Sequence, residues 1–287
     1  MIDINFESLT KPNLWSYIAL AGYGIMTEKA KKENGEMTEK EREILEYIIK
    51  RAELPKREIN QILENIQQAL LSCDYEVRSV QIRVISLALI GGSQTFGEIP
   101  FEVGLYFDPI LNVPYIPGST IKGAVRAGVF DLLFKRGASK EEAEIECKRF
   151  FGDNESAGLV GFTDAYPIDK SENGYLLYPD VMSPHYKSDT ATELDVSPTP
   201  IIYLTIAPGT KFQFYLFYKK ERGSGEKKRR LIIGNSQDSD LAEVPVQDLG
   251  KLGILDLGLL YSFYRGVGAK TSVGYSRFEV LSYEPVR

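Results

Sequence analysis

Residues 115–126 read Tyr115-Ile116-Pro117-Gly118-Ser119-Thr120-Ile121-Lys122-Gly123-Ala124-Val125-Arg126. The Pro-Gly pair predicts a turn. Ser119 predicts the N-cap of a helix, because a serine oxygen accepts a backbone N–H of the following turn. The next apolar positions have the i, i+3, i+4 spacing of a buried helix face: Ile121, Ala124, Val125, Gly128, Val129, Leu132 and Leu133. We therefore expect a core helix over residues 119–135.

The expected helix carries two cations near its start. Lys122 and Arg126 are four residues apart, so they share one flank close to the positive end of the helix dipole. Such cations often serve only to solubilise a helix. Here, however, no Asp or Glu occurs between Asp108 and Asp131, while acidic residues gather at 139–155 and in the N-terminal third. This segregation favours a surface that contacts phosphates without reading bases.

A second acid-free stretch follows Arg265 and contains glycines at several positions, Gly266-Val267-Gly268-Ala269-Lys270-Thr271-Ser272-Val273-Gly274-Tyr275. Glycines let backbone amides approach a ligand closely and form an anion-binding nest. A tight turn between a helix and a strand would also use one or two glycines. It would not explain the flanking Arg265, Lys270 and Thr271. Together with Ser272 and Tyr275, these residues are candidate contacts to a phosphate backbone.

The same loop superficially resembles a nucleotide-binding P-loop through Ala269-Lys270-Thr271. That motif requires glycine directly before the lysine and a second glycine five residues earlier, after a strand and before a helix. Ala269 and Tyr264 occupy those positions here, and the loop follows an expected helix and precedes an expected strand. The sequence therefore excludes an ATPase of this class.

Composition sets the outer bounds of function. The chain has 287 residues, a net charge of −6, two cysteines and one histidine. Two cysteines give no disulfide framework and fit a reducing, cytoplasmic setting, and no zinc-type Cys/His spacing or secretory signal occurs. No apolar run is long enough to span a membrane. Because proteins that wrap duplex DNA are usually basic, any nucleic-acid surface must be local, and the acidic remainder suits contact with other proteins.

The wider pattern predicts an α+β protein. Residues 10–72 are helical in pattern, with a break at Leu54-Pro55, and from residue 77 the sequence alternates like a strand. We expect strands near 80–84, 99–107, 158–165, 175–181, 200–206, 210–219, 229–234 and 273–283, and helices at 139–150 and 246–264. A β-α-β unit with a closing α-β pair predicts a ferredoxin-like sheet of the RNA-recognition type with large insertions. We expect residues 1–76 to form a helical segment packed on a core domain of residues 77–287.

Two further features are open to more than one interpretation. The charge run 219–230 lies between two expected strands and is either a solvated hairpin tip or an RNA contact. Four tyrosines are either base-stacking residues or half-buried strand residues: Tyr175, Tyr178, Tyr186 and Tyr203.

Five motifs, in the order in which they occur along the chain, carry a resemblance to a known family. Residues 116–123 resemble the signature of the RAMP superfamily of CRISPR-associated proteins, and residues 266–275 resemble its C-terminal glycine-rich loop. Between them, Phe150-Phe151-Gly152, Phe162-Thr163-Asp164-Ala165-Tyr166-Pro167 and Asp180-Val181-Met182-Ser183-Pro184-His185-Tyr186 resemble the sixth-subunit family of type III-B (Cmr) effector complexes. The resemblance covers roughly residues 77–283.

The resemblance implies a non-catalytic, RNA-binding structural subunit of a CRISPR ribonucleoprotein in antiviral defence. Such a subunit would cap the filament near the 3′ end of the guide (CRISPR) RNA and would contact guide RNA, target RNA and other Cmr subunits, without a cofactor, metal or membrane. The candidate RNA-binding residues are Ser119, Lys122, Arg126, His185, Lys187, Arg265, Lys270, Thr271, Ser272 and Tyr275.

Enzymatic alternatives remain. The only histidine, His185, could act with Lys187 as the general base of a metal-independent CRISPR RNA-processing endoribonuclease, although a packed or RNA-contacting histidine is commoner in a Ser-Pro-His-Tyr context. A metal-dependent nuclease would need clustered carboxylates, for which the candidates are Asp164, Asp169 and Asp180. A pure protein scaffold would bind RNA equally well without its basic residues.

Overall fold

The computed structural model describes residues 13–29, 39–92, 96–101, 103–182, 201–219 and 252–286. Its centre is an antiparallel sheet built around β1 (Tyr75–Val84), which lies between β8 (Lys211–Lys219) and β9 (Phe278–Pro285). The other edge of β8 pairs with β4 (Val160–Phe162) and β5 (Tyr166–Asp169). β1 and β8 are therefore the central strands.

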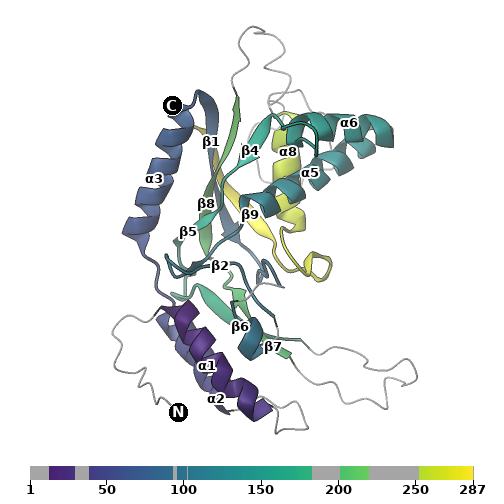
Figure 1. The fold of residues 1–287 in the computed structure, drawn as a ribbon. Coiled ribbons are helices and arrows are strands. Elements are labelled where there is room, and N and C mark those ends of the chain that lie inside the picture. Colours follow the sequence, from purple (N-terminus) through teal and green to yellow (C-terminus); the bar gives the residue numbers. More distant parts are fainter. Residues whose placement is uncertain are drawn as a thin grey trace, which may run out of the picture.

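The connections between these strands define the fold. Helix α5 (Gly118–Lys135) follows β1 and precedes β4, and α8 (Ile254–Arg265) joins β8 to β9. The order strand, helix, two strands, helix, strand, with both middle strands flanked by antiparallel partners, is the ferredoxin-like arrangement. The expected α+β fold class is confirmed. Figure 1 shows α5, α6 (Lys140–Phe151) and α8 on one side of the sheet and α3 (Lys56–Ser72) on the other.

Strand β8 is buried on both faces of the sheet, and its side chains are apolar at successive positions. Phe212, Phe214 and Leu216 face a core that includes Val125 of α5 and Phe263 of α8. The intervening side chains belong to a second core, whose members include Tyr215, Phe217 and residues of the N-terminal helices. A strand that is apolar on both sides matches a sheet covered by helices on both sides.

The N-terminal helices α1 (Leu14–Lys29), α2 (Glu39–Arg51) and α3 contribute to this second core. Ile59 and Leu63 of α3 are buried, and the hydroxyl of Tyr215 lies 3.2 Å from Oε1 of Gln67. Helix α3 therefore covers the part of the sheet that RNA-recognition domains use for stacking bases. The buried apolar side chains of α3 therefore pack against the rest of the chain.

An antiparallel ribbon of β6 (Leu177–Met182) and β7 (Ile201–Ile206) is inserted between β5 and β8. The strand predicted at 99–107 is wrong: a short helix, α4 (Glu98–Phe101), occupies its first part, followed by β2 (Phe107–Asp108) and β3 (Val113–Pro114). Pro100 cannot donate to a strand ladder, and Gly97 turns the chain with a φ of 87°. β5 was not predicted.

Other boundaries differ modestly from the predictions. Helix α6 begins with the predicted capping box of Ser139 and Glu142. The last strand begins at Phe278 rather than 273, because Thr271–Val273 forms a turn of 3-10 helix, η4. The predicted strand at 229–234 and the first residues of the predicted helix 246–264 lie outside the described residues. Among the described helices, none has the length and apolar character required to cross a membrane.

Candidate nucleic-acid interface

Helix α5 begins one residue earlier than predicted, and Ser119 is not its N-cap. Pro117 occupies the cap position without a side-chain hydrogen bond, while the amide of Gly118 donates to Oδ1 of Asp164 at 2.7 Å. A Cβ at Gly118 would lie 2.3 Å from the carbonyl oxygen of Phe162. Because glycine allows this close approach, a carboxylate from the β4–β5 connection replaces the local cap. Ser119 lies exposed in the first turn.

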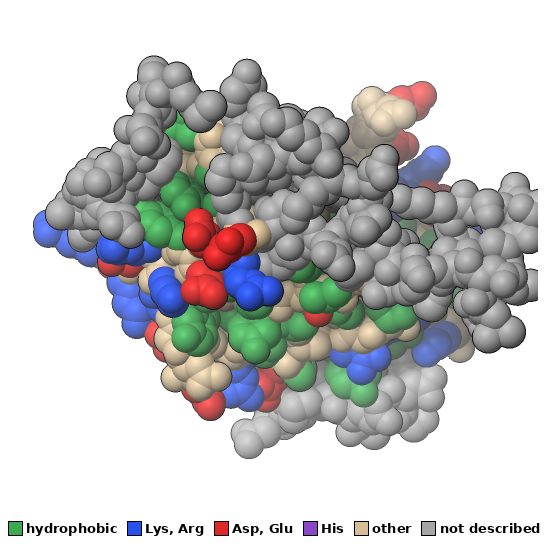
Figure 2. All heavy atoms as spheres, turned by 90° about the horizontal axis from the view of Figure 1, so that it is seen from below, with side chains coloured by type: hydrophobic (Ala, Val, Ile, Leu, Met, Phe, Trp, Pro, Cys, Tyr) green, Lys and Arg blue, Asp and Glu red, His purple; other side chains and the backbone are tan. Residues whose placement is uncertain are grey.

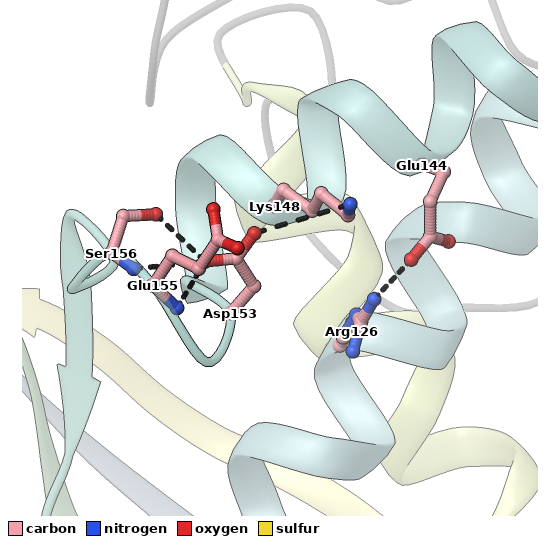
Figure 3. Close-up of polar contacts among 6 residues, drawn as sticks. All are labelled: Arg126, Glu144, Lys148, Asp153, Glu155 and Ser156. Atoms are coloured by element: carbon pink, nitrogen blue, oxygen red, sulfur yellow. Dashed lines mark hydrogen bonds and ion pairs between the residues drawn. The ribbon is translucent and has the colours of Figure 1, made fainter.

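The two cations of α5 differ in their surroundings. Lys122 is half-buried and has no ion-pair partner among the described residues. Arg126 forms an ion pair with Glu144 of α6, and each side chain is about two-fifths exposed, at 41% and 43% (Figure 3). In the folded protein, an acidic residue of segment 139–155 therefore lies next to a cation of the basic helix. The charge segregation along the sequence does not fully persist in space.

The end of α6 is organised by another acid in the same view. Asp153 accepts backbone N–H groups from Glu155 and Ser156, at 3.0 and 2.9 Å, and lies 3.9 Å from Nζ of Lys148 (Figure 3). These hydrogen bonds, with the smaller attraction of Lys148, hold the pKa of Asp153 below its usual range. The acids beside α6 thus serve local structure and pair with nearby cations.

Helix α5, which begins within the first predicted motif, packs directly against α8, which precedes the second. A Cβ at Gly128 would lie 2.7 Å from the carbonyl oxygen of Gly258, and Oγ of Ser262 donates to the carbonyl of Ala124 at 2.9 Å. At the end of α8, Arg265 contacts Asp131 of α5 at 3.1 Å. Arg265, like Arg126, is therefore paired with an acid.

The glycine loop after α8 is fixed by its backbone. The amide of Ala269 donates to the carbonyl of Leu89 at 2.8 Å, and the amide of Leu89 donates to Oγ of Ser276 at 3.0 Å. Gly268 has a φ of 127°, and a Cβ there would lie 2.7 Å from the carbonyl oxygen of Leu89. The loop is thus held against the segment after β1 through Ala269 and Ser276.

The tip of the loop presents unused backbone donors. Lys270 has left-handed backbone geometry, with φ 57° and ψ 25°, and η4 follows it directly. Within the described chain, the backbone N–H groups of Lys270, Thr271 and Ser272 have no hydrogen-bond acceptor. Successive N–H groups at a left-handed to right-handed junction form an anion-binding nest. The left-handed backbone and the three N–H groups are a more specific argument for the predicted nest than the glycines of the sequence.

The side chain of Lys270 lies between two tyrosines. Its Nζ donates to the hydroxyl of Tyr203 at 2.8 Å and lies 4.8 Å from the ring centres of both Tyr203 and Tyr275. Both tyrosine hydroxyls donate to Oδ2 of Asp180 on β6, from Tyr203 at 2.6 Å. We call Asp180, Tyr203, Lys270 and Tyr275 the lysine cage. It holds the tip of the loop against the β6–β7 ribbon.

Electrostatics at the lysine cage follow from these contacts. Burial acts to raise the pKa of Asp180, but hydrogen bonds from the two tyrosines and the charge of Lys270 outweigh it, so the pKa is lowered overall. Burial and the hydrogen bond to Asp180 raise the pKa of Tyr275. The carboxylate is therefore satisfied within the cage. Sequence reasoning singled out Asp180 only as a possible metal ligand and missed this contact, because β6 and the loop are far apart in the chain.

The three candidate carboxylates have separate positions. Asp164 caps α5, Asp180 belongs to the lysine cage, and Asp169 contacts Lys56 at 2.9 Å and Lys211 at 3.3 Å. In the part of the chain that the structure describes, no group of three or more His, Cys, Asp or Glu side chains could hold a metal ion. His185, Lys187, Tyr186 and residues 220–230 lie outside the described residues.

The surface at the end of the molecule that carries α1 and α2 is mixed in charge. Figure 2, which views the molecule from below, shows basic and acidic side chains interspersed with hydrophobic ones. The described residues of this face therefore form no extended patch of one charge sign.

The sequence of this chain is similar to those of several known proteins. The sequence pattern of the RAMP superfamily matches residues 81–279. The CRISPR system CMR subunit Cmr6 of Saccharolobus solfataricus is 35% identical over 96% of this chain and 85% of its own length. The Cmr6 subunit of Pyrococcus furiosus is 27% identical over 63% of this chain and 62% of its own length. The Csm3 endoribonuclease of Streptococcus thermophilus is 33% identical over 33% of this chain and 46% of its own length.

A solved structure is similar over nearly the whole chain. One chain of the type III-B Cmr-beta structure bound to cognate target RNA superposes with a TM-score of 0.70 at 30% identity, covering 96% of this chain and 93% of that chain. The similarity extends beyond the residues matched by the family pattern and includes the N-terminal helices.

Proposed function

Because this chain belongs to the RAMP superfamily, we propose that it is an RNA-binding structural subunit of a type III-B CRISPR effector complex. The similarity to Cmr6 over 96% of the chain supports this assignment, as does the similarity to a chain of a Cmr complex bound to target RNA. In this proposal the subunit works with guide RNA, target RNA and sister subunits.

The observation that carries the RNA-binding role is the nest at the loop tip. Three consecutive backbone N–H groups, at Lys270, Thr271 and Ser272, lack acceptors among the described residues, and no acidic residue occurs between Asp256 and Glu279. A phosphate supplies the acceptors that these donors need, and backbone donors do not distinguish bases. The loop therefore suits a guide strand whose sequence varies.

The position in the complex is part of the same proposal. The subunit would cap the filament near the 3′ end of the guide, with the α5 motif and the glycine loop toward RNA. The helical segment of residues 1–76, packed on the core domain of residues 77–287, would face sister subunits. Support for this division comes from the mixed charge of the face in Figure 2, since a phosphate-binding face concentrates positive charge.

We infer a non-catalytic role from what the interface offers. Arg126 and Arg265 are paired with acids, and Lys270 is held in the lysine cage, so these groups suit fixed electrostatic contacts rather than proton transfer. The alternative is cleavage through His185, and its test is described in the Discussion.

The test is to compare the variant Lys122→Ala/Arg126→Ala/Lys270→Ala with wild type in the complex reconstituted with sister subunits and guide RNA. We expect weaker RNA retention, similar for guides of different sequence. The salt dependence should be flatter by about one unit of slope for each phosphate that the variant no longer neutralises. The single Arg126→Ala variant should show the smallest change, because Glu144 already offsets the charge of Arg126.

Lys140→Ala provides the matched control. Lys140 is an exposed lysine at the start of α6, outside both motifs. Its removal should leave affinity and salt slope unchanged. A triple variant that matched this control in both measurements would exclude RNA binding by these residues.

A further inference from the structure

The β6–β7 ribbon places an exposed aromatic ring beside the lysine cage. Tyr178 is 46% exposed, whereas Tyr203 on the neighbouring strand is fully buried. In the ribbon, Asp180 pairs with Tyr203 and Tyr178 pairs with Thr205. Side chains two residues apart on a strand share one face and are about 7 Å apart along it. Tyr178 therefore lies on the ribbon face that contacts the glycine loop.

The backbone on both sides of Tyr178 is fixed. Its carbonyl accepts the hydroxyl of Thr205 at 2.9 Å, and Asp180, two residues later, is tied to the loop through Tyr275. The backbone that carries the exposed ring is thus fixed on the strand that contacts the glycine loop through Asp180. This differs from a surface tyrosine on a free loop.

We propose that Tyr178 stacks on the base of an unpaired RNA nucleotide whose phosphate lies in the nest of residues 270–272. This proposal rests on the proposed RNA-binding function and adds a specificity for unpaired nucleotides. An aromatic ring next to phosphate donors is the arrangement that sequence-independent single-strand binding uses, because every base has a stacking face.

The charges around the ring favour a nucleotide over an apolar peptide. Lys270 supplies a cation, and residues 257–278 contain no acid. The carboxylate in the cage, Asp180, already accepts hydrogen bonds from two tyrosines. An anionic ligand with a flat ring satisfies both the donors and the exposed tyrosine.

Four variants of the full chain test this proposal: Tyr178→Leu, Tyr178→Phe, Lys270→Ala and the control Tyr175→Leu. Tyr175 is 38% exposed but lies before β6, outside the paired ribbon. Binding would be measured with a single-stranded oligouridine and with an RNA duplex of equal length. Separately, ultraviolet crosslinking of the reconstituted, guide-loaded complex would show whether residue 178 contacts RNA.

We expect Tyr178→Leu to bind the single strand about tenfold more weakly and to lose its crosslink, while Tyr178→Phe and Tyr175→Leu behave like wild type. The affinity for duplex should change little. If Tyr178→Leu matches Tyr175→Leu in both assays while Lys270→Ala weakens binding, the stacking role is wrong and the proposed function stands.

Other outcomes are equally decisive. If neither Tyr178→Leu nor Lys270→Ala alters RNA binding, both proposals fail. If Tyr178→Leu instead reduces the recovery of sister subunits while RNA crosslinking at the loop persists, the ring contacts protein and the stacking role is overturned.

Discussion

The α5 motif and the glycine loop are alike in sequence but differ in the folded protein. Both combine glycines with cations, and neither contains an acidic residue. In the folded protein, Asp164 accepts a hydrogen bond from the first amide of α5, and Glu144 forms an ion pair with Arg126. The loop instead keeps three backbone donors without acceptors among the described residues.

This difference teaches that an acid-free sequence window does not define an acid-free surface. Carboxylates from the β4–β5 connection and from α6 bind an amide and a cation of α5. The carboxylate near the loop, Asp180, attracts Lys270 and accepts hydrogen bonds from two tyrosines, but it does not contact the three backbone donors at the loop tip. The α5 motif is therefore mainly a packing element, and its Lys122 has no acidic partner within the described chain. We therefore propose the loop as the stronger anion site.

The largest expected effect tests the packing role of the α5 motif. Gly118→Ala should destabilise the protein by about 2 kcal/mol or more, because the new Cβ would meet backbone atoms of Phe162 and Thr163 within 3 Å. Gly123→Ala, in the same helix, meets nothing within 4 Å and should stabilise by about 0.5–1 kcal/mol. Chemical denaturation of the two variants measures both. Equal effects would contradict the packing role.

A smaller effect separates capping from RNA binding at α5. Asp164→Ala should cost about 1 kcal/mol of stability, since the amide of Gly118 loses its acceptor. RNA affinity should stay constant or rise, because a negative charge leaves the surface. Chemical denaturation and RNA retention by the reconstituted complex measure the two effects.

The control for this comparison is Asp153→Ala, which removes a similar acceptor from the turn after α6. It should lower stability without changing the charge at the start of α5. A loss of RNA affinity in Asp164→Ala beyond that of the control would show that the cap itself orders an RNA contact.

A third prediction concerns the pH dependence of the lysine cage. The folded pKa of Asp180 lies below its unfolded value of about 3.9, so its contribution to stability is present above about pH 4 and is lost as pH falls through the folded pKa. Wild type should therefore be more stable than Asp180→Asn, and the difference in their free energies of unfolding should be larger at pH 6 than at pH 3. Tyr275→Phe, which removes one hydrogen bond to Asp180, should reduce the difference between the two pH values. A difference independent of pH would argue against the cage.

The smallest expected effect tests whether the complex uses His185 as a general base. His185→Ala should leave target-RNA cleavage by the complex within about tenfold of wild type, because a catalytic base normally contributes about a hundredfold or more. Metal-independent cleavage by the purified wild-type chain, absent in the variant, would establish the endoribonuclease alternative and overturn the non-catalytic role.

The sequence alone determined the longer helices and strands and their order. The hydrophobic pattern predicted the bounds of α5, α6, β7 and β8 to within a few residues, because the spacing of apolar residues in such segments indicates which face is buried. It could not place α4 and β5, which are short and take their form from neighbours. The motifs at 116–123 and 266–275 were sufficient to point to the RAMP superfamily, which the comparisons confirm.

The tertiary structure alone decided which charges are available. Ser119 had the right chemistry for a cap, but Gly118 lies so close to β4 that Asp164 takes that place. Lys270 of the loop donates to Tyr203, which in turn donates to Asp180, and these two contacts join the loop to the β6–β7 ribbon. Periodicity reports which face of an element is buried, but not which distant side chain meets it. Such pairings depend on the packing of whole elements, so local sequence could suggest the anion site but not its partners.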